Sequence, residues 1–354
     1  MEISINPLGI REFAGSALLI GLQEGALDKN LDLLKEKFGY SFDKVLEKEN
    51  FKGKRGDLTS FNFLEGQIEK LIIIGLGEKD HLRIDDLRKE ISKAIKNCSV
   101  NGGTLGILLP RENLEPEKVI KALGESCRLS FFKDLRYRSS PDPIRKAPKI
   151  ELLGFDENYS KYLQDIEAVC SGVELARELV GAPPCDLTPN ALAETAKKIA
   201  NDHKINCKIL SQKECEKLEM GAYLAVSKGS DLEPKFIHLT YKSEGPIKNK
   251  LVMIGKGLTF DSGGYNLKVG AAQIDLMKFD MGGSAAVLGA AKAIAQIKPK
   301  AIEVHFIIAS CENMINGSAL HPGDIITASN GKTIEVNNTD AEGRLTLADA
   351  LVYA

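Results

Sequence analysis

Short apolar runs divide the first part of the chain. Residues 16–22, 70–76 and 104–110 are rich in leucine and isoleucine, and their length and composition are typical of buried strands. Longer and more polar segments lie between them. This alternation predicts an α/β domain with a parallel or mixed sheet.

Two of the longer segments carry apolar residues at the spacing of an amphipathic helix. Residues 114–126 form one of them. In the other, residues 84–98, one helical stripe holds Ile84, Leu87, Ile91 and Ile95. Both segments are therefore predicted to be helices.

The pattern changes near the middle of the chain. Residues 136–148 are rich in serine, proline and charge, which indicates a surface connection, and residues 149–155 read as one more strand. Residues 162–180 then read as a long helix, closed by Gly181 and a pair of prolines. We place a domain boundary near residue 155. This predicts domains 1–155 and 156–354, with a connecting helix at about 160–180.

The second part carries clear local signals. Thr188 before Pro189 predicts a helix start, and Ser211 with Glu214 predicts a capping box. Asn330–Gly331 between two β-branched runs indicates a hairpin. The remaining elements expected are a helix rich in small residues at 282–297 and strands at 235–241, 251–255 and 303–309.

Composition adds few constraints. The 354 residues are 43% hydrophobic and 27% charged, with a net charge of −2, which gives no general attraction to nucleic acid or to anionic membranes. The seven cysteines form no CxxC pair, and the chain opens without a secretory signal. No apolar run is long enough to span a membrane. We therefore expect reduced thiols and a cytoplasmic location.

Four acids of the second part lie among glycine, alanine and apolar residues. A lone aspartate in such a loop is usually a helix cap or turn residue, and Asp280 before Met281 is the best case for that interpretation. If the four converge, they must be paired with cations or bind metal. These acids are Asp261, Asp280, Asp340 and Glu342.

The segment NNTDAEGR, residues 337–344, crowds charge onto alternate positions. In an extended segment, Asp340, Glu342 and Arg344 would point to one side, with only Ala341 and Gly343 between them. Adjacent carboxylates of this kind can bridge two divalent ions roughly 3.5–4 Å apart. An oxygen-rich ligand set favours Mn²⁺ or Mg²⁺, with Zn²⁺ as an alternative.

The histidines and the GxG stretches are weaker indications of function. None of the five histidines has a metal-site spacing such as HExxH, so each is read as a surface or core histidine. GxG occurs at 75–77 and 255–257, but neither stretch completes GxGxxG. A dinucleotide site is therefore disfavoured.

Several motifs together resemble one known family. VMIGKGLTFDSGG, LMKFDMGGSAA and NNTDAEGRLTLADAL are similar to the signatures of the leucyl, or cytosol, aminopeptidases. The resemblance is strong from about residue 170 onward. It implies an α/β catalytic domain with a central mixed sheet flanked by helices, preceded by a macro-like α/β domain. It also implies a two-metal exopeptidase that removes N-terminal residues, often leucine, from peptides.

The resemblance assigns metal ligands by motif. Asp261 and Glu342 would bridge the two metals, and Asp340 would complete the tighter site. Lys256 and Asp280 would complete the more exchangeable site. Lys256 would have to be neutral to bind a metal, so a salt bridge to one of the carboxylates remains its alternative interpretation.

The same resemblance assigns catalytic roles. Lys268 would polarise the scissile carbonyl, and Arg344 would hold an anion, bicarbonate in the family, that acts as general base. The alternatives are a solvated loop lysine and a buried ion pair, respectively. Asp280 and the exchangeable metal would bind the free α-amine of a peptide substrate. The family forms homo-hexamers, and no membrane partner is implied.

The family's catalytic domain continues beyond LADALVYA, where this sequence stops. We therefore expect a C-terminally truncated chain that lacks part of the specificity pocket and is poorly folded or weakly active on its own. Two further classes stay open. One is a nucleic-acid or ADP-ribose binding module, which no basic stripe in residues 1–155 supports. The other is a catalytically silent scaffold whose metals only stabilise the fold.

Overall fold

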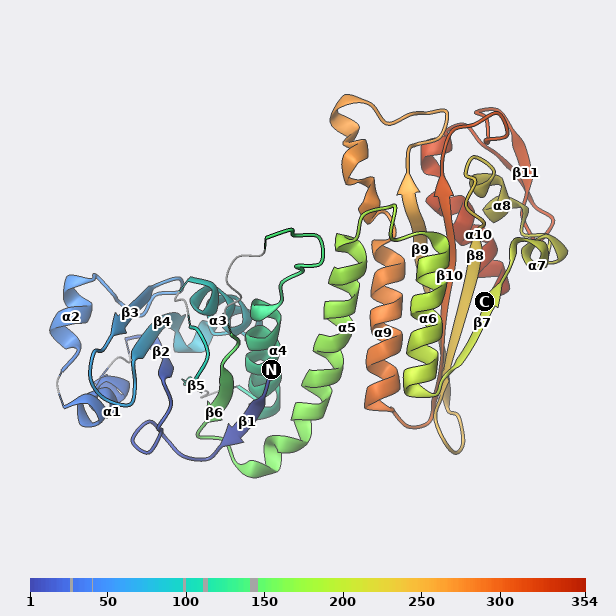
Figure 1. The fold of residues 1–354 in the computed structure, drawn as a ribbon. Coiled ribbons are helices and arrows are strands. Elements are labelled where there is room, and N and C mark those ends of the chain that lie inside the picture. Colours follow the sequence, from blue (N-terminus) through green and yellow to red (C-terminus); the bar gives the residue numbers. More distant parts are fainter. Residues whose placement is uncertain (26–27, 40, 98–99, 111–113, 141–145) are drawn as a thin grey trace. The chain divides into compact units, whose positions relative to one another are not determined.

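The computed structural model describes residues 1–25, 28–39, 41–97, 100–110, 114–140 and 146–354, which divide into two α/β units, Met1–Cys170 and Ser171–Ala354 (Figure 1). The division falls inside helix α5 (Leu163–Gly181), which is the connecting helix expected at about 160–180. The domain boundary expected near residue 155 remains a prediction. The predicted surface connection lies partly outside the described residues, at 141–145.

The first unit is built on a six-stranded sheet in the order β1-β6-β5-β2-β4-β3. All neighbouring pairs are parallel except β3 with β4. The three apolar runs are confirmed as β2, β4 and β5, and nearly all of their side chains are buried. The strand bounds are β1 (Ile3–Asn6), β2 (Ala17–Glu24), β3 (Leu58–Asn62), β4 (Lys70–Glu78), β5 (Thr104–Leu108) and β6 (Lys149–Leu153).

Helices cover both faces of this sheet. The predicted stripe of α3 (Ile84–Asn97) packs with α4 (Pro116–Phe131) into one apolar core, where Leu87 and Ile91 are fully buried. A second core on the opposite face includes residues of α1 (Asp28–Phe38) and α2 (Asp43–Lys48). The sequence pattern predicted α3 and α4 but neither α1 nor α2. Short 3₁₀ turns lie at Lys79–His81 and Glu157–Tyr162.

The second unit contains a four-stranded mixed sheet in the order β7-β8-β10-β9. Strands β9 and β10 run parallel to each other, while β7 and β10 are antiparallel to β8. Its long strands confirm the runs at 235–241, 251–255 and 303–309, although β9 and β10 extend well beyond them. The bounds are β7 (Asn206–Leu210), β8 (Lys235–Lys242), β9 (Asn249–Asp261) and β10 (Ile302–Asn313).

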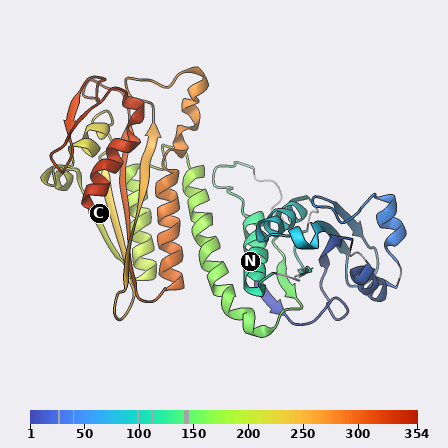
Figure 2. The same ribbon diagram turned by 180° about the vertical axis from the view of Figure 1, so that it is seen from behind.

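Each face of this sheet is covered by different helices. The C-terminal part of α5 packs on one face with α6 (Pro189–His203) and α9 (Gly282–Ile297). On the other face lie α7 (Gln212–Lys217), α8 (Gly221–Ser227) and α10 (Gly343–Tyr353), and Figure 2 shows α10 in red across the strands. Small residues allow α5 and α9 to touch, because a Cβ on Gly289 would lie 2.5 Å from the carbonyl oxygen of Gly172.

The local signals of the second part are confirmed. The Thr188 hydroxyl accepts a hydrogen bond from the Ala191 N–H at the start of α6, and Ser211 and Glu214 form the predicted capping box. The hairpin around Asn330–Gly331 pairs β11 (Ile325–Thr327) with β12 (Thr333–Glu335). Further 3₁₀ turns lie at Gly270–Ala272, Ile274–Phe279 and Thr339–Ala341.

The structure also bears on the cysteines and on membrane-spanning segments. Six cysteines in the described part of the chain are free thiols, and Cys98 lies outside the described residues. No helix among the described residues is long and apolar enough to cross a bilayer.

Candidate metal centre

The site forms where the parallel strands β9 and β10 end. In α/β folds, the carboxyl ends of neighbouring parallel strands form the usual ligand-binding edge. Asp261 is the last residue of β9 and is only 2% exposed. The glycines that follow it turn the chain sharply, since Gly263 and Gly264 have φ values of 88° and 64°, which favour glycine.

Lys256 lies on β9 and joins two of the predicted acids. Its Nζ is 2.8 Å from Asp280 Oδ1 and 2.8 Å from Glu342 Oε1. Asp280 follows the 3₁₀ turn Ile274–Phe279 and precedes α9. The N-cap of α9 is Met281, and the Asp280 carboxylate faces Lys256 instead. Asp280 is therefore not the helix cap that its sequence position suggested.

Lys268 joins the other two acids. Its Nζ lies 3.0 Å from Asp261 Oδ2 and forms an ion pair with Asp340. The Lys268 side chain is only 11% exposed, which excludes the alternative of a solvated loop lysine. Two lysines thus separate four carboxylates that would otherwise repel one another.

The extended conformation predicted for residues 340–344 is wrong. The segment forms a 3₁₀ turn at Thr339–Ala341 and enters α10 at Gly343. The Asn338 side chain accepts a hydrogen bond from the Asp340 N–H and thereby stabilises the turn. The strand periodicity that would place Arg344 beside Asp340 and Glu342 therefore does not apply.

Gly343 is small because Lys256 occupies the space next to it. A Cβ at Gly343 would lie 2.5 Å from Lys256 Cε and 2.9 Å from its Nζ. Such distances are too short for a β-carbon, so any larger residue would push the lysine aside. The absence of a side chain at position 343 is thus explained by its close contact with Lys256 of β9.

The structure does bring the acids together. Oxygen atoms of Asp261, Asp340 and Glu342 all lie within 4.8 Å of one another. Glu342 is 1% exposed, and its Oε2 has no hydrogen-bond partner among the described residues. An unsatisfied buried carboxylate oxygen is costly unless a cation binds it. The donor set therefore fits a hard divalent ion.

The electrostatics of the cluster reflect these contacts. Burial raises the pKa of Asp280 to about 6, although its hydrogen bond to Lys256 acts in the opposite direction. Burial favours the neutral form of Lys256, but hydrogen bonds to Asp280 and Glu342 outweigh it and raise the lysine's pKa. The pKa of Lys268 is raised through Asp340 and Asp261 in the same way, against burial. Both lysines are therefore ammonium groups here, and for Lys256 this is the salt-bridge alternative.

Arg344 forms no hydrogen bond or ion pair with the four acids in the described part of the chain. Its side chain is exposed on α10 and forms no hydrogen bond or ion pair with other residues in the described ranges. The alternative of a buried ion pair for Arg344 is therefore wrong. Among the seven predicted site residues, Arg344 is the one that the fold leaves at the surface.

Three polar residues next to the acids were not predicted from the sequence: Asn313 and Thr339, which are buried, and Asn266, which is exposed. Asn313 ends β10 and donates to Asp261 Oδ1 at 2.8 Å, while Thr339 and Asn266 exchange hydrogen bonds. Each is a neutral polar residue in a loop or at a strand end, positions where polar residues are common. No sequence signal available here distinguishes them from ordinary turn residues.

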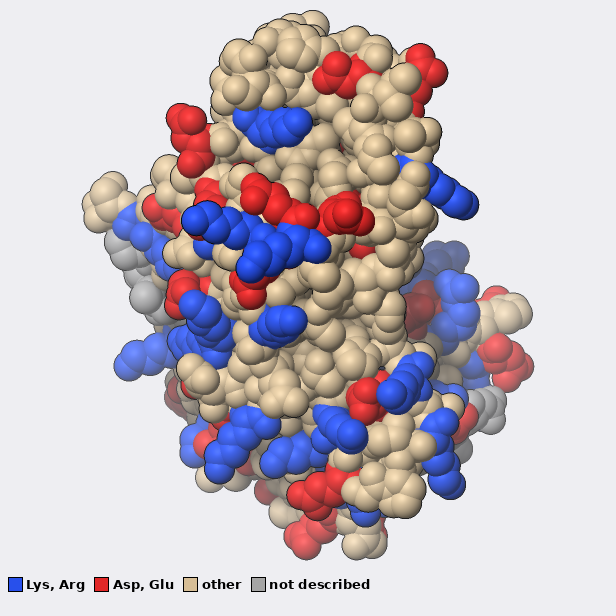
Figure 3. Space-filling view, turned by 90° about the vertical axis from the view of Figure 1, so that its right-hand side faces the viewer, with Lys and Arg blue, Asp and Glu red and all other residues tan. Residues whose placement is uncertain are grey.

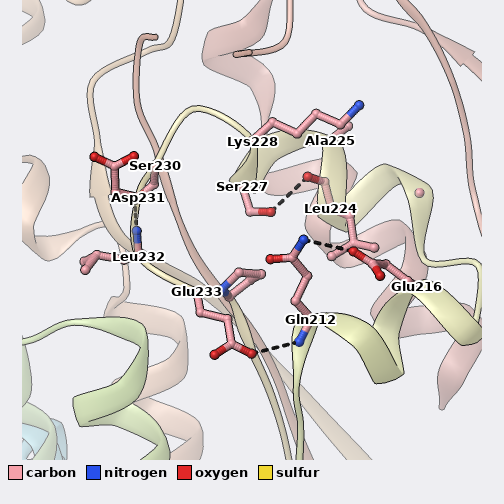
Figure 4. Close-up of a pocket in the computed structure, with 12 residues that line it drawn as sticks. Gln212, Glu216, Leu224, Ala225, Ser227, Lys228, Ser230, Asp231, Leu232 and Glu233 are labelled. Carbon is pink, nitrogen blue, oxygen red and sulfur yellow. Dashed lines mark hydrogen bonds between the residues drawn. The ribbon is translucent and has the colours of Figure 1, made fainter. Parts of the chain in front are cut away.

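A separate cavity lies elsewhere in the second unit. It measures about 560 Å³ and opens between α7, α8 and the segment 228–234 (Figure 4). Its polar groups bond to one another: the Gln212 N–H donates to Glu233, its side chain donates to Glu216, and Ser227 donates to the Leu224 carbonyl oxygen. None of the predicted site residues lines this cavity.

Comparisons with known proteins agree on one family. Residues 174–354 match the cytosol aminopeptidase family, catalytic domain, and residues 19–141 match the N-terminal domain of the same family. A probable cytosol aminopeptidase of Prochlorococcus marinus (strain MIT 9313) is 55% identical over 100% of this chain. One from Synechococcus sp. (strain CC9311) is 49% identical over 100% of this chain. This chain covers 72% of the length of each relative.

A solved structure gives the same result. A mutant of tomato leucine aminopeptidase matches with a TM-score of 0.88 and 38% sequence identity. The match covers 100% of this chain and 71% of that one. The two-unit α/β fold with mixed sheets is therefore shared with a solved aminopeptidase.

Proposed function

Because the chain belongs to the cytosol aminopeptidase family of metallo-aminopeptidases, we propose that it binds two divalent ions and releases N-terminal amino acids, preferentially leucine, from peptides. The observation that supports this most directly is the group of three carboxylates, Asp261, Asp340 and Glu342, with oxygens within 4.8 Å of one another. Bound there, the ions would polarise the scissile carbonyl and acidify the attacking water.

The proposed ligands come from the motif, and the contacts in the structure support them. Asp261 and Glu342 would bridge the ions, Asp340 would complete one site, and Lys256 and Asp280 would complete the other. In the structure, Lys256 already reaches both Asp280 and Glu342, which supports a shared site for these three residues. As a ligand, Lys256 would be neutral, because two cations would replace its charge.

Lys268 and Arg344 would act on the substrate side. Lys268 is buried and has a charged ammonium, so it can stabilise the oxyanion that develops at the scissile carbonyl. Arg344 is exposed and unpaired within the described part of the chain, which leaves its guanidinium free for an anion such as bicarbonate. That anion would act as the general base. Asp280 would help bind the substrate's α-amine.

The metal identity, the cellular location and the oligomeric state are proposed from the family and not from the geometry of this site. We propose Mn²⁺ as the main metal, with Zn²⁺ as the alternative, because carboxylates accept both. We also propose a cytoplasmic homo-hexamer. The face of the molecule drawn in Figure 3 carries lysine and arginine together with aspartate and glutamate, and mixed charge of this kind offers no support for a nucleic-acid partner.

The test combines metal content with activity. The purified 354-residue chain is dialysed against Mn²⁺, analysed for metal and assayed with leucine p-nitroanilide. About two ions per chain and Mn²⁺-dependent release of nitroaniline are expected. Asp261→Asn should lose both properties, whereas Asp202→Asn, at an exposed position of α6, should keep them. A chain that takes up no Mn²⁺ would contradict the proposal.

A further inference from the structure

Asn313 connects the two segments that carry the acids. It is the last residue of β10 and is 4% exposed. Its amide nitrogen donates to Asp261 Oδ1 at 2.8 Å and to the Thr339 carbonyl oxygen at 3.1 Å. Both partners can only accept, so the orientation of the amide is unambiguous. One side chain thus ties the end of β9 to the residue before Asp340.

The hydrogen bonds to Asp261 select which of its oxygens faces the cluster. Oδ1 accepts from the Asn313 amide and, at 2.9 Å, from the Gly263 N–H. Oδ2 lies 3.0 Å from Lys268 Nζ. With Oδ1 engaged by two donors, Oδ2 is the oxygen left for a cation.

A shift in register, with one extra residue in β9, places Asp261 opposite Asn313. Cys311 pairs with Leu258 but Asn313 pairs with Asp261, so the register of β10 against β9 shifts between them. Bulges near active sites redirect a side chain in this way. The Asn313 carbonyl oxygen also accepts from the Ser262 N–H and hydroxyl, at 2.9 and 2.8 Å, which holds the backbone in place.

Thr339 continues the connection to Asp340. It is 1% exposed, and its hydroxyl donates to the Gly263 carbonyl oxygen at 2.7 Å. The same hydroxyl accepts from the Asn266 N–H at 2.9 Å, and the Thr339 N–H donates to Asn266 Oδ1 at 2.8 Å. The turn that presents Asp340 is therefore bonded to the glycine-rich turn after Asp261 on both sides.

We infer that Asn313 and Thr339 are positioning residues, which hold Asp261 and Asp340 at the spacing that a divalent cation requires. They act through the ligands and touch no ion themselves. The inference rests on the proposed metal-dependent function. Partners that orient metal ligands typically contribute 10–100-fold to metal affinity or activity.

The test measures Mn²⁺ affinity of the full 354-residue chain directly. Equilibrium dialysis with metal analysis gives the affinity, and the Mn²⁺ electron paramagnetic resonance spectrum reports the geometry of the site. Asn313→Asp keeps the shape but loses both donors, and Thr339→Val loses only the hydroxyl. Each should weaken Mn²⁺ binding by about 10–100-fold and alter the spectrum.

Two variants serve as matched controls. Thr339→Ser retains the hydroxyl and should restore an affinity near that of the unchanged chain. Ser310→Ala removes a buried hydroxyl of β10 whose oxygen has no hydrogen-bond partner in the described residues, so Mn²⁺ affinity should not change. If Asn313→Asp fails to fold, the comparison of Thr339→Val with Thr339→Ser still decides the question.

The outcomes separate the two proposals. If the unchanged chain binds Mn²⁺ and the Asn313→Asp and Thr339→Val variants bind it equally well, the positioning role is overturned while the proposed function stands. If Thr339→Ser is as weak as Thr339→Val, the hydroxyl contacts do not explain the effect and the role of Thr339 is overturned. If the unchanged chain takes up no Mn²⁺, both proposals fail.

Discussion

At the scale of single residues, the site depends on two lysines placed among four carboxylates. Lys256 and Lys268 each contact two acids, so the two ammonium groups offset only part of the negative charge of the four carboxylates. Removing either ammonium group would leave buried carboxylates close together without a compensating charge, and they would repel one another. Lys256 is a proposed metal ligand and Lys268 a proposed donor to the oxyanion, so replacing the first should affect metal binding and replacing the second should affect turnover.

Replacing Lys268 with methionine tests its catalytic role. The variant should hydrolyse leucine p-nitroanilide about 10²–10³-fold more slowly, because one donor to the developing oxyanion is lost. Metal content measured by elemental analysis should remain near that of the unchanged chain. Lys332→Met, an exposed residue of the hairpin, is the control and should keep full turnover. Equal turnover in both variants would exclude Lys268 as a donor to the oxyanion.

Replacing Gly343 with alanine tests the contact with Lys256. The new methyl group would lie 2.5 Å from Lys256 Cε, so the lysine or the start of α10 must move. We expect a loss of about 1–3 kcal/mol in unfolding free energy, measured by urea denaturation, together with weaker Mn²⁺ binding.

Gly317→Ala is the matched control for this substitution. A β-carbon at Gly317 would meet no atom within 4 Å, so stability and metal affinity should hardly change. Unaltered stability and Mn²⁺ binding in Gly343→Ala would show that the site tolerates displacement of Lys256.

At the scale of elements, the C-terminal end of α10 is anchored to the sheet by a chain of side chains. Tyr353 contacts His238 Nδ1 at 3.0 Å, and His238 Nε2 contacts His305 Nδ1 at 2.9 Å. Glu303 Oε1 lies 3.0 Å from His305 Nε2 and can accept a hydrogen bond from it. In this order each imidazole faces one partner with Nδ1 and another with Nε2. Since Glu342 begins α10, the anchor also supports the acidic cluster.

The anchor predicts a pH-dependent stability. Burial lowers the pKa of His238 below 6.5, with repulsion from His305 and Lys208 adding to the effect. The folded chain therefore binds fewer protons than the unfolded chain just below pH 6.5. The contribution of His238 is complete above that pH and decreases as the pH falls toward the folded-state value.

Urea denaturation at pH 7, 6 and 5 measures this effect. The unchanged chain should lose more unfolding free energy between pH 7 and 5 than His238→Gln, which has no imidazole to protonate. Tyr353→Phe keeps both histidines and serves as the control with the steeper dependence. Identical pH dependence in all three chains would exclude His238 as the source.

At the scale of the whole molecule, β9 forms one edge of its sheet. The sheet order places β10 on one side of β9, and among the described residues no strand pairs with its other side. Leu251 and Val252 of this strand are 48% and 42% exposed. Edge strands with exposed apolar side chains are templates for association.

Lysine on the β9 edge should reduce such association. We expect concentration-dependent self-association of the unchanged chain in size-exclusion chromatography with light scattering, and less of it in Leu251→Lys and Val252→Lys. Ile325→Lys, at an apolar position of β11 that is 70% exposed, should associate like the unchanged chain. A monomeric unchanged chain at all concentrations would refute this expectation.

Much of the fold followed from local patterns. Apolar runs identified β2, β4 and β5, helical spacing identified α3 and α4, and the caps at Thr188 and Ser211 marked helix starts. These signals are local because side-chain periodicity and capping depend on residues a few positions apart. The apolar pattern was not read as helical at α1 or α2, although Leu31 and Leu34 of α1 are buried.

The sequence alone determined which residue types could bind metal, because carboxylates among small residues are recognisable in the motif itself. Only the tertiary structure decided how they meet: a helix start rather than a strand presents Glu342, and Arg344 stays at the surface. It alone also revealed Asn313, which donates to an aspartate 52 positions away along the chain. Contacts between distant segments depend on how strands pair and turns close, and no local pattern encodes them.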